Sequence, residues 1–564
     1  MARIRHIDIR NFRCIEQLSW WPSDGINCLI GPGDSGKSTL LDAIDYCLGA
    51  RRTIQVTDAD FCRLDVERPI AISITIGDLD DALRSLETYG PYLRSCDAVS
   101  KTIDDEPEAG RETVLTIRLH VGADLEPSWS LVSDRTASLD QQRLLNWSDR
   151  QRIAPTRLGS LPDNNLAWRR GSVLSRLTDE RANTGASLAN AARAARSAFG
   201  DVADAQLNAT LKVVQETAAE LGVDVGDTLR AMLDAHSISL SGGTVALHNS
   251  DGIPLRALGT GSSRLLLAGL QRRASEAGDL ILIDEVEFGL EPHRLIRLLG
   301  SLGAKEADPP LQAFISTHSP VAIRELRAGQ LHVLRCIGGA HSVASVGDAT
   351  DVQGTVRAFP EAFLASSVII CEGATEVGLL RGIDQHWVSE KGFSPLMAQG
   401  VALVDAGGCS KLYGRASAFT ALGYRCAVLR DDDVQPDTAT ESSFTTAGNA
   451  VFTWATGNST ESELFASLDD AGVQALLEYA VATVGEALVD DHIKSASKGV
   501  QTLTSCRANS GAATRQVLAS AAHGCGWYKS VGRMEDAART VIGPSITAAK
   551  GTFSVDPILE WASG

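Results

Sequence analysis

The feature that most constrains the fold is the segment Gly31-Pro-Gly-Asp-Ser-Gly36-Lys37-Ser38, which fits the pattern G-x-x-x-x-G-K-[ST]. It follows the apolar run 26–30 and opens a helical repeat of apolar residues. In this pattern, glycines let backbone N–H groups surround phosphates at a helix N-terminus, while the lysine and serine reach the terminal phosphates and Mg²⁺. We therefore predict an ATP and Mg²⁺ site made of Gly31, Gly33, Ser35, Gly36, Lys37, Ser38 and Thr39.

Length and composition narrow the class of protein. The chain has 564 residues, 44% of them hydrophobic, and a formal charge of −18, which predicts several domains with proper cores and excludes disorder. The negative net charge argues against a protein whose whole surface binds nucleic acid, but it is compatible with a local basic groove. No apolar run approaches the roughly 20 residues that span a bilayer, and the eleven cysteines form no CxxC pair. We expect a cytoplasmic protein with buried free thiols and no membrane partner.

Changes in the spacing of apolar residues along the sequence divide the chain into predicted domains. Residues 1–60 alternate and then switch to helical spacing, and 69–77 and 113–121 are β-branched runs typical of strands. An Ala-rich helical stretch follows, in which Gly200 and Gly222 are predicted helix ends, and then a predicted hairpin over 237–249. A second α/β block starts near Glu361, and the chain from about 475 has a helical pattern. The expected domains are an ATPase domain in two parts (1–172 and 237–350), a helical insert (173–236) and a C-terminal α/β domain with helices (361–564).

Two acids end a buried-strand pattern at Leu280-Ile-Leu-Ile-Asp284-Glu285. In a nucleotide hydrolase an aspartate at this place holds Mg²⁺ and the following glutamate polarises water, which makes Asp284 a cofactor ligand and Glu285 catalytic. Taken alone, the segment is equally typical of a strand followed by a solvated acidic loop. Its place among other motifs favours the first interpretation.

The order of the motifs is informative. Asn11-Phe-Arg13 is followed by the phosphate-binding loop, Leu258-Gly-Thr-Gly-Ser-Ser263-Arg264, the acids with Gly289-Leu-Glu-Pro292, and Ser316-Thr-His318-Ser-Pro320. This order resembles the ABC-type ATPase heads of the SMC, RecF and OLD (overcoming lysogenisation defect) families. The resemblance implies that Ser262, in the signature motif, caps nucleotide held by a second copy and that His318 senses the γ-phosphate.

The resemblance to ABC-type heads has departures. The signature is far from LSGGQ, and Gln55 matches the Q-loop glutamine only weakly. Slow hydrolysis, with ATP acting mainly as a switch, follows from these departures. The short helical insert replaces the long coiled coil of an SMC head, which disfavours structural DNA tethering.

Carboxylates gather at two predicted strand ends. Glu372 ends the strand pattern 367–371, Glu376 lies four residues on, and Asp431 and Asp433 alternate after the strand pattern 425–430. Two like charges about 4 Å apart repel by about 4 kcal/mol at an effective dielectric near 20, so four converging carboxylates raise their pKa values or recruit cations. Oxygen ligands without His or Cys favour Mg²⁺ or Mn²⁺. The alternative for either motif alone is a capping glutamate and a solvated acidic turn.

Together these motifs resemble a Toprim domain, and EAFLASSVIICEGATE (361–376) is very similar to the entry to Toprim in the OLD family. The resemblance implies an α/β fold: an ABC-type ATPase head with a helical dimerisation insert, then a Rossmann-like Toprim domain with a helical tail. It also implies that Ser459 and Glu461 complete one metal site, with Glu463 as the alternative, and that Lys529 stabilises transition-state charge. Trp527 and Tyr528 are expected in the core or at its rim.

The implied activity is two-metal phosphodiester hydrolysis, with Glu372 and Asp431 among the catalytic residues. One ion lies with Asp431, Asp433 and Glu461, and the other with Glu372 and Glu376. The first hypothesis is an ATP-regulated DNA endonuclease in anti-phage defence, a homodimer or larger oligomer, alone or with a helicase partner as in Gabija-type systems. The alternative is a RecF-like repair ATPase with a noncatalytic Toprim domain, and a third possibility is that ATP inhibits cleavage. A topoisomerase would need a tyrosine nucleophile in a separate DNA-gate domain, and none of the seven tyrosines lies in a sequence of that kind. A primase would be expected to have a zinc module, which the cysteine spacing argues against.

Overall fold

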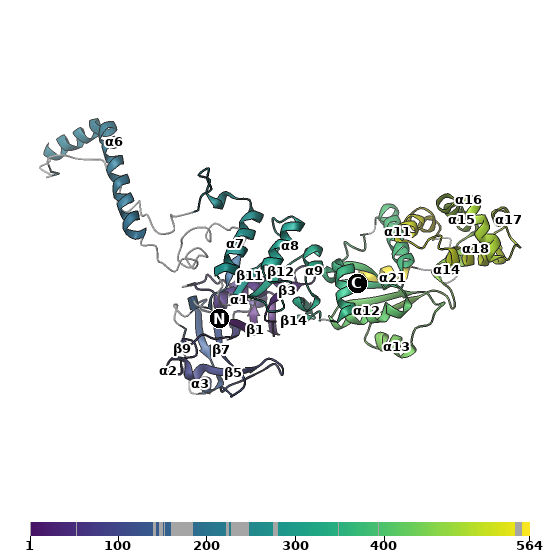
Figure 1. The fold of residues 1–564 in the computed structure, drawn as a ribbon, viewed down its shortest axis with the longest axis horizontal. Helices are drawn as coiled ribbons and strands as arrows, with labels where there is room; N and C mark the ends of the chain where they lie inside the picture. The colour runs from purple at the N-terminus through teal and green to yellow at the C-terminus, as the bar shows by residue number, and fades with distance from the viewer. Residues whose placement is uncertain are drawn as a thin grey trace. The chain divides into compact units, whose positions relative to one another are not determined.

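The computed structural model describes residues 2–51, 53–138, 143–145, 150, 151, 153–158, 184–220, 225, 226, 247–274, 280–347, 349–392, 394–546 and 555–564. Most of the predicted hairpin over 237–249, and the predicted helix end at Gly222, fall outside these ranges. The chain has two compact units. One contains most of the residues up to Thr317, and the other contains His318–Gly564 with the short segments Ile15–Leu18 and Cys28–Lys37. Three β-sheets are described (Figure 1).

The first sheet is antiparallel and has eight strands. Its main path is β2 (Ile15–Trp20), β1 (Arg3–Phe12), β4 (Ile70–Gly77), β7 (Glu112–Val121), β5 (Leu93–Asp97) and β6 (Thr102–Asp104), and β8 (Pro127–Val132) pairs with β7 and with β9 (Arg143–Leu144). The two predicted β-branched runs are confirmed as β4 and β7, which pair along their length from Ile70 with Val121 to Ile76 with Leu115. Seven of the eight residues of β4 are buried, and β7 is buried continuously over 114–117.

The second sheet is mostly parallel and carries the nucleotide motifs. Its order is β10 (Thr156–Leu158), β11 (Leu280–Ile283), β12 (Gln312–Ser316), β3 (Ile26–Ile30), β13 (Leu331–Ile337) and β14 (Ala340–Ser345). Neighbours β10, β11 and β12 run parallel, as do β3 and β13, while β14 runs antiparallel to β13. Helices α1 (Lys37–Leu48), α8 (Pro292–Ser301) and α9 (Pro320–Glu325) follow β3, β11 and β12. The motifs therefore lie at carboxyl ends of buried strands, where ligands bind in α/β folds.

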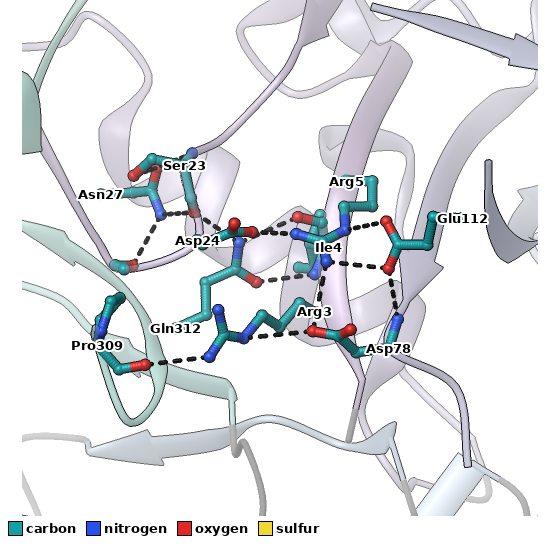
Figure 2. A network of polar contacts seen from close by, with 11 residues as sticks. Arg3, Ile4, Arg5, Ser23, Asp24, Asn27, Asp78, Glu112, Pro309 and Gln312 are labelled. Atoms are coloured by element: carbon teal, nitrogen blue, oxygen red, sulfur yellow. Dashed lines mark hydrogen bonds and ion pairs between the residues drawn. The ribbon is translucent and has the colours of Figure 1, made fainter. Parts of the chain in front are cut away.

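A buried amide joins the first sheet to the second (Figure 2). The Gln312 side chain, fully buried on β12, accepts from Ile4 N at 2.7 Å and donates to Ile4 O at 3.0 Å and to Ser23 O at 2.7 Å. Beside it, Arg5 donates to Glu112 on β7 at 2.7 and 2.9 Å. Because each of these buried polar groups has a partner, the network fixes the registration of β1 against β12 without an unpaired group.

The Ala-rich stretch forms α6, a helix over Thr184–Glu220. The predicted helix end at Gly200 is wrong, because α6 continues through this residue. A single glycine costs a helix only about 1 kcal/mol relative to alanine, and the good helix formers on either side outweigh that cost. Helix α7 (Thr260–Ala274) then carries the motif that begins at Leu258.

The third sheet is parallel and forms the C-terminal α/β domain. Its order is β16 (Val401–Asp405), β15 (Ser367–Cys371), β17 (Arg425–Arg430) and β18 (Ala450–Thr453). Helices α11 (Ala374–Lys391), α12 (Cys409–Ala421), α13 (Thr438–Thr446) and α14 (Thr460–Ser467) follow the four strands in chain order. Helix α10 (Thr350–Ala358) precedes the domain. All four predicted acids after β15 and β17 therefore lie at one edge of this sheet.

The predicted helical tail is confirmed. It comprises α15 (Asp470–Val484), α16 (Glu486–Ala496), α17 (Leu503–Ala508), α18 (Ala512–Cys525), α19 (Val531–Ala537), a π-helical turn (Ala538–Ile542), α20 (Gly543–Ser545) and α21 (Asp556–Ser563). Trp527 and Tyr528 are fully buried in its core, as expected. Within the described ranges no single helix is long and apolar enough to cross a membrane, although α15 and α16 pass that test as a bent pair.

Candidate functional site: a phosphate-binding loop and a carboxylate cluster

The phosphate-binding loop is tightly packed around its lysine. Gly31 has φ +129° and a Cβ there would lie 2.6 Å from the carbonyl oxygen of Leu334, so only glycine fits. Lys37 is 5% exposed, and its Nζ donates to Gly31 O at 3.2 Å, to Pro32 O at 2.7 Å and to Ser35 Oγ at 3.3 Å. The ammonium is thus satisfied by the loop itself, and phosphate oxygens would have to replace these acceptors.

The other loop residues are arranged at the start of α1. Gly36 has φ +96°, Gly33 and Ser38 are exposed, and Thr39 accepts a hydrogen bond from the Cys14 thiol at 3.4 Å. A hydroxyl and backbone N–H groups at a helix N-terminus are the groups that bind phosphate and its metal ion. All seven residues predicted from the sequence therefore occupy one loop and one helix start.

The acids after β11 lie in a turn held by β12. The Ser316 hydroxyl donates to an Asp284 carboxylate oxygen and accepts from Glu285 N at 2.8 Å. Glu285 is exposed and has φ +47°, a left-handed conformation that is strained for a residue with a Cβ. The hydrogen bond from Glu285 N to Ser316 is one of the contacts that hold this conformation.

Helix α7 meets this acidic turn. Ser262 accepts from Arg294 Nη1 at 2.9 Å, and a Cβ on Gly261 would lie 2.3 Å from the carbonyl oxygen of Gly289. His318 is exposed just before α9. Sequence reasoning assigned no role to Arg264, the last residue of the signature motif, which is buried and donates to three carbonyl oxygens of the turn.

In the C-terminal domain, Glu372 and Asp431 lie next to each other at the ends of β15 and β17. Glu372 N donates to Leu429 O at 2.9 Å, and Asp431 N donates to Glu372 Oε2 at 3.2 Å. Burial raises the pKa of Glu372, and the nearby carboxylate of Asp433 raises it further. The predicted convergence of these two strand ends is confirmed.

A third carboxylate joins them through one hydroxyl. Thr460 Oγ1 lies 2.7 Å from Glu376 Oε1 and 2.8 Å from Asp431 Oδ1, and it accepts from Trp454 Nε1 at 2.8 Å. Because a hydroxyl has one hydrogen to donate, the second of these carboxyl contacts needs a proton on the carboxyl group. Burial together with the neighbouring acids raises the pKa of Glu376 to about 7 and that of Asp431 to about 8.

The fourth carboxylate belongs to Glu461 in α14. The side chain is 2% exposed, its Oε2 lies 3.1 Å from His523 Nδ1, and its Oε1 has no hydrogen-bond partner among the described residues. Glu463, the sequence alternative, accepts from Ala455 N, Asn458 Nδ2 and Ser467 Oγ at 2.7–3.1 Å. The Glu463 carboxylate is therefore occupied by hydrogen bonds from neighbouring residues, whereas Glu461 Oε1 is free to accept from a ligand.

Other predicted ligands contribute less in this conformation. Asp433 is exposed, and Ser459 is the N-cap of α14, accepting from Ser462 N at 3.3 Å. Lys529 is exposed between α18 and α19. Over the described ranges, no three His, Cys, Asp or Glu side chains already have the arrangement that holds a metal ion.

Sequence reasoning missed Thr460, Trp454 and His523. Thr460 could have been found, because it is the middle residue of the Ser459–Glu461 motif. His523 lies 62 residues beyond Glu461 on α18, and only the packing of the helical tail brings the two together.

Comparison with known proteins gives two family matches. Residues 26–324, just over half of the chain, match the family described as "AAA domain, putative AbiEii toxin, Type IV TA system", and residues 363–433 match "Overcoming lysogenization defect protein-like, TOPRIM domain". The OLD nuclease of Thermus scotoductus is 24% identical over 468 residues, which are 77% of this chain and 82% of that protein.

Other similarities are shorter or more distant. The DNA replication and repair protein RecF of Nitrosococcus oceani is 40% identical over 74 residues, so the match covers 13% of this chain and a fifth (20%) of RecF. Among solved structures, an SMC head bound to the C-terminal winged-helix domain of ScpA covers 62% of this chain at 14% identity, with a TM-score of 0.36. A RecF structure covers 61% at 11% identity, with a TM-score of 0.31.

The two matched domains, with the motifs and sheets described above, define a protein that joins an ABC-type ATPase domain to a C-terminal Toprim domain. The chain belongs to the family described as "AAA domain, putative AbiEii toxin, Type IV TA system", and its OLD-like Toprim domain and its OLD nuclease relative support an OLD family ATPase–Toprim protein. The predicted fold class is therefore confirmed, and the chain is a nuclease-type ATPase whose domains are of classes that use ATP and divalent metal ions.

Proposed function

We propose that the protein is an ATP-regulated DNA endonuclease that depends on divalent metal ions and hydrolyses phosphodiester bonds at the Toprim cluster. The observation that carries this proposal is the convergence of Glu372, Glu376, Asp431 and Glu461. Asp431 N donates to Glu372, the Thr460 hydroxyl lies between Glu376 and Asp431, and Glu461 contacts His523 while its other buried oxygen has no partner among the described residues. A buried acceptor without a donor is costly, and a bound cation would remove that cost.

The donor set fits Mg²⁺ or Mn²⁺, because it consists of carboxylate oxygens without sulfur. Asp431, Asp433 and Glu461, with the hydroxyl of Ser459, would hold one ion, and Glu372 and Glu376 would hold another. Bound divalent ions would neutralise phosphate charge and supply a hydroxide nucleophile at neutral pH. The acids must rotate from their present contacts, because Thr460 now occupies oxygens of Glu376 and Asp431.

The chain's own groups have further roles in this proposal. Thr460 and His523 orient the carboxylates, and Trp454 orients the Thr460 hydroxyl. Lys529 adds positive charge as the transferring phosphate becomes more negative. It stands two residues beyond Trp527, which the tail core fixes in place.

The ATPase domain controls the cleavage. ATP and one Mg²⁺ bind at Gly31–Thr39 with Asp284, Glu285 polarises water, and His318 senses the γ-phosphate. Ser262 contacts nucleotide held by a second copy, so the protein acts as a homodimer or larger homo-oligomer. The insert at 173–236 is the dimerisation domain in this proposal. The ATPase domain comprises 1–172 and 237–350, and the Toprim domain with its helical tail comprises 361–564. We propose a cytoplasmic role in anti-phage defence, alone or with a helicase partner.

The test is incubation of supercoiled plasmid with the pure protein in Mg²⁺ or Mn²⁺, with and without ATP, beside Asp431→Ala. Nicked or linear product from the wild type but not from the variant supports the proposal, and the ATP lanes give the sign of regulation. Equal cleavage by both proteins contradicts it. No cleavage under any metal or nucleotide condition favours a noncatalytic Toprim domain, as in the RecF-like alternative.

A further inference from the structure

Arg264 has a buried guanidinium that has no role in the ATP site or in the carboxylate cluster as proposed above. It lies in the second turn of α7, and the residue is 2% exposed. Its Nη2 donates to Asp284 O at 3.0 Å, and its Nη1 donates to Glu285 O at 3.1 Å and to Phe288 O at 2.7 Å. One side chain therefore links α7 to three main-chain carbonyls of the turn that carries both acids.

The turn needs such support. Glu285 is left-handed at φ +47°, a conformation that costs on the order of 1 kcal/mol and persists only where surrounding contacts impose it. Ser316 holds the turn from the β12 side through Glu285 N, and Arg264 holds it from the α7 side through Glu285 O. The peptide groups on both sides of the Glu285 Cα are thus fixed by hydrogen bonds from different elements.

The start of α7 also touches the far end of the same turn. Gly261 lies so close to Gly289 that a Cβ would be 2.3 Å from the Gly289 carbonyl oxygen, and Gly289 itself has φ +72°. Burial lowers the pKa of Arg264, while the nearby carboxylates of Glu287, Asp284 and Glu285 favour its charged form. The helix and the acidic turn therefore form one hydrogen-bonded, charge-balanced body.

We propose that Arg264 is a positioning residue for ATP hydrolysis: it fixes the main chain of the 284–288 turn, directs the Glu285 carboxylate at the attacking water, and transmits displacements of α7 to that carboxylate. This inference rests on the proposed function, in which Glu285 acts in hydrolysis. It assigns no contact between Arg264 and nucleotide. Loss of Arg264 therefore lowers turnover and leaves nucleotide affinity unchanged.

The test compares Arg264→Met and Arg264→Lys in the full-length protein. A matched control is Arg150→Met, because Arg150 is also a buried arginine of the ATPase domain that donates to two carbonyls, Gly49 O at 2.6 Å and Arg51 O at 2.8 Å. We expect kcat for ATP to fall roughly 30-fold in Arg264→Met, with KM and the Kd of a fluorescent ATP analogue within about threefold of wild type. Arg264→Lys, which keeps the charge but not the fork of donors, recovers part of kcat. Arg150→Met keeps wild-type kcat.

A double variant separates positioning from general destabilisation. Because Arg264 acts through Glu285, adding Arg264→Met to Glu285→Gln lowers kcat by less than about twofold further. Three results would overturn the inference. The losses in kcat could multiply in the double variant, kcat could be unchanged in Arg264→Met, or Arg264→Lys could bind the analogue more weakly. If Arg264→Met does not fold, Arg264→Lys and its double variant give the same comparison. A wild-type protein without ATP turnover contradicts the role of Glu285 in hydrolysis, whereas failure of the plasmid test contradicts the proposed nuclease function, so the two results are distinguishable.

Discussion

The phosphate-binding loop and the Toprim cluster both lie at carboxyl ends of strands in largely parallel sheets, but their polar groups are balanced differently. At the loop, the Lys37 ammonium finds three oxygen acceptors within its own loop. At the cluster, acceptors outnumber donors. Glu376 and Asp431 share a single hydroxyl, and one oxygen of Glu461 has no donor.

This difference shows what each site takes from outside. Phosphate oxygens can replace the loop acceptors of Lys37 one for one, so nucleotide can enter and leave with little change in the loop. The cluster cannot become fully ionised without added positive charge, since its carboxylates are buried beside one another. The two sites therefore point to different ligands, an anion that replaces the acceptors of Lys37 at the loop and cations that add positive charge at the cluster.

Removing a central acid is the strongest way to break the comparison. Asp431→Ala takes away the carboxylate that the hydroxyl and the backbone N of Thr460 contact, and it keeps the Asp431 N–H that donates to Glu372. We expect DNA cleavage to fall on the order of 1,000-fold, because loss of a metal ligand removes both the ion and its positioning. ATP turnover, measured on the same preparation by phosphate release, stays within about twofold of wild type. A parallel loss of both activities would show that the two sites are not separable.

The converse variant is Lys37→Ala. Without the ammonium, the loop loses its charge-assisted contact to the terminal phosphates, and we expect the Kd for ATP to rise on the order of 100-fold. Calorimetry with a nonhydrolysable ATP analogue measures this. Metal-dependent cleavage without nucleotide persists in the variant and no longer responds to ATP, whichever sign that response has. A variant still regulated by ATP would contradict control through this loop.

Glu461 and Glu463 offer a matched pair within one helix. Glu461→Gln removes charge from the acid with the open oxygen, and we expect Mn²⁺ affinity to fall roughly 10- to 100-fold. Glu463→Gln disturbs three accepted hydrogen bonds, so it lowers the melting temperature by a few degrees, about 1 kcal/mol or more, and leaves Mn²⁺ affinity unchanged. Calorimetric titration with Mn²⁺ and a thermal scan measure the two effects. Exchanged outcomes would assign the ligand to Glu463.

The sequence predicts the motif residues well because their roles are local. The loop Gly31–Ser38, the acids after β11 and the acids after β15 and β17 each depend on one strand end, which period and composition mark clearly. Gly200 misled the prediction because a glycine inside a strong helical pattern reduces stability without ending the helix.

Residues that act across long sequence separations could not be predicted. His523 reaches Glu461 only after the four tail helices α15 to α18 pack, and Arg264 reaches the acidic turn because α7 packs against that turn. Neither contact is marked by a regular residue spacing or by a hydrophobic period in the sequence. Similarly, Glu461 and Glu463 are equivalent in the sequence, and only the partners supplied by the Asn458 loop distinguish them.

The smallest predicted effect is the most direct measure of charge balance in the cluster. Glu376 and Asp431 have pKa values of about 7 and about 8, above those of unfolded acids, so they retain protons in the metal-free protein at neutral pH. For an acid with a raised folded-state pKa, the folded protein binds more protons than the unfolded chain between the two values. The stability of the metal-free protein should therefore fall as pH rises from about 5 to 8.

Metal binding displaces these protons, which gives the opposite pH dependence. Mn²⁺ affinity should rise about tenfold per pH unit for each proton released between about pH 6 and 8, and then level off. Calorimetry in two buffers of different ionisation enthalpy counts the protons. Asp431→Asn should flatten the stability profile. A flat Mn²⁺ profile in the wild type would mean that the cluster is already ionised, and the contrast between the two sites would then have to rest on geometry alone.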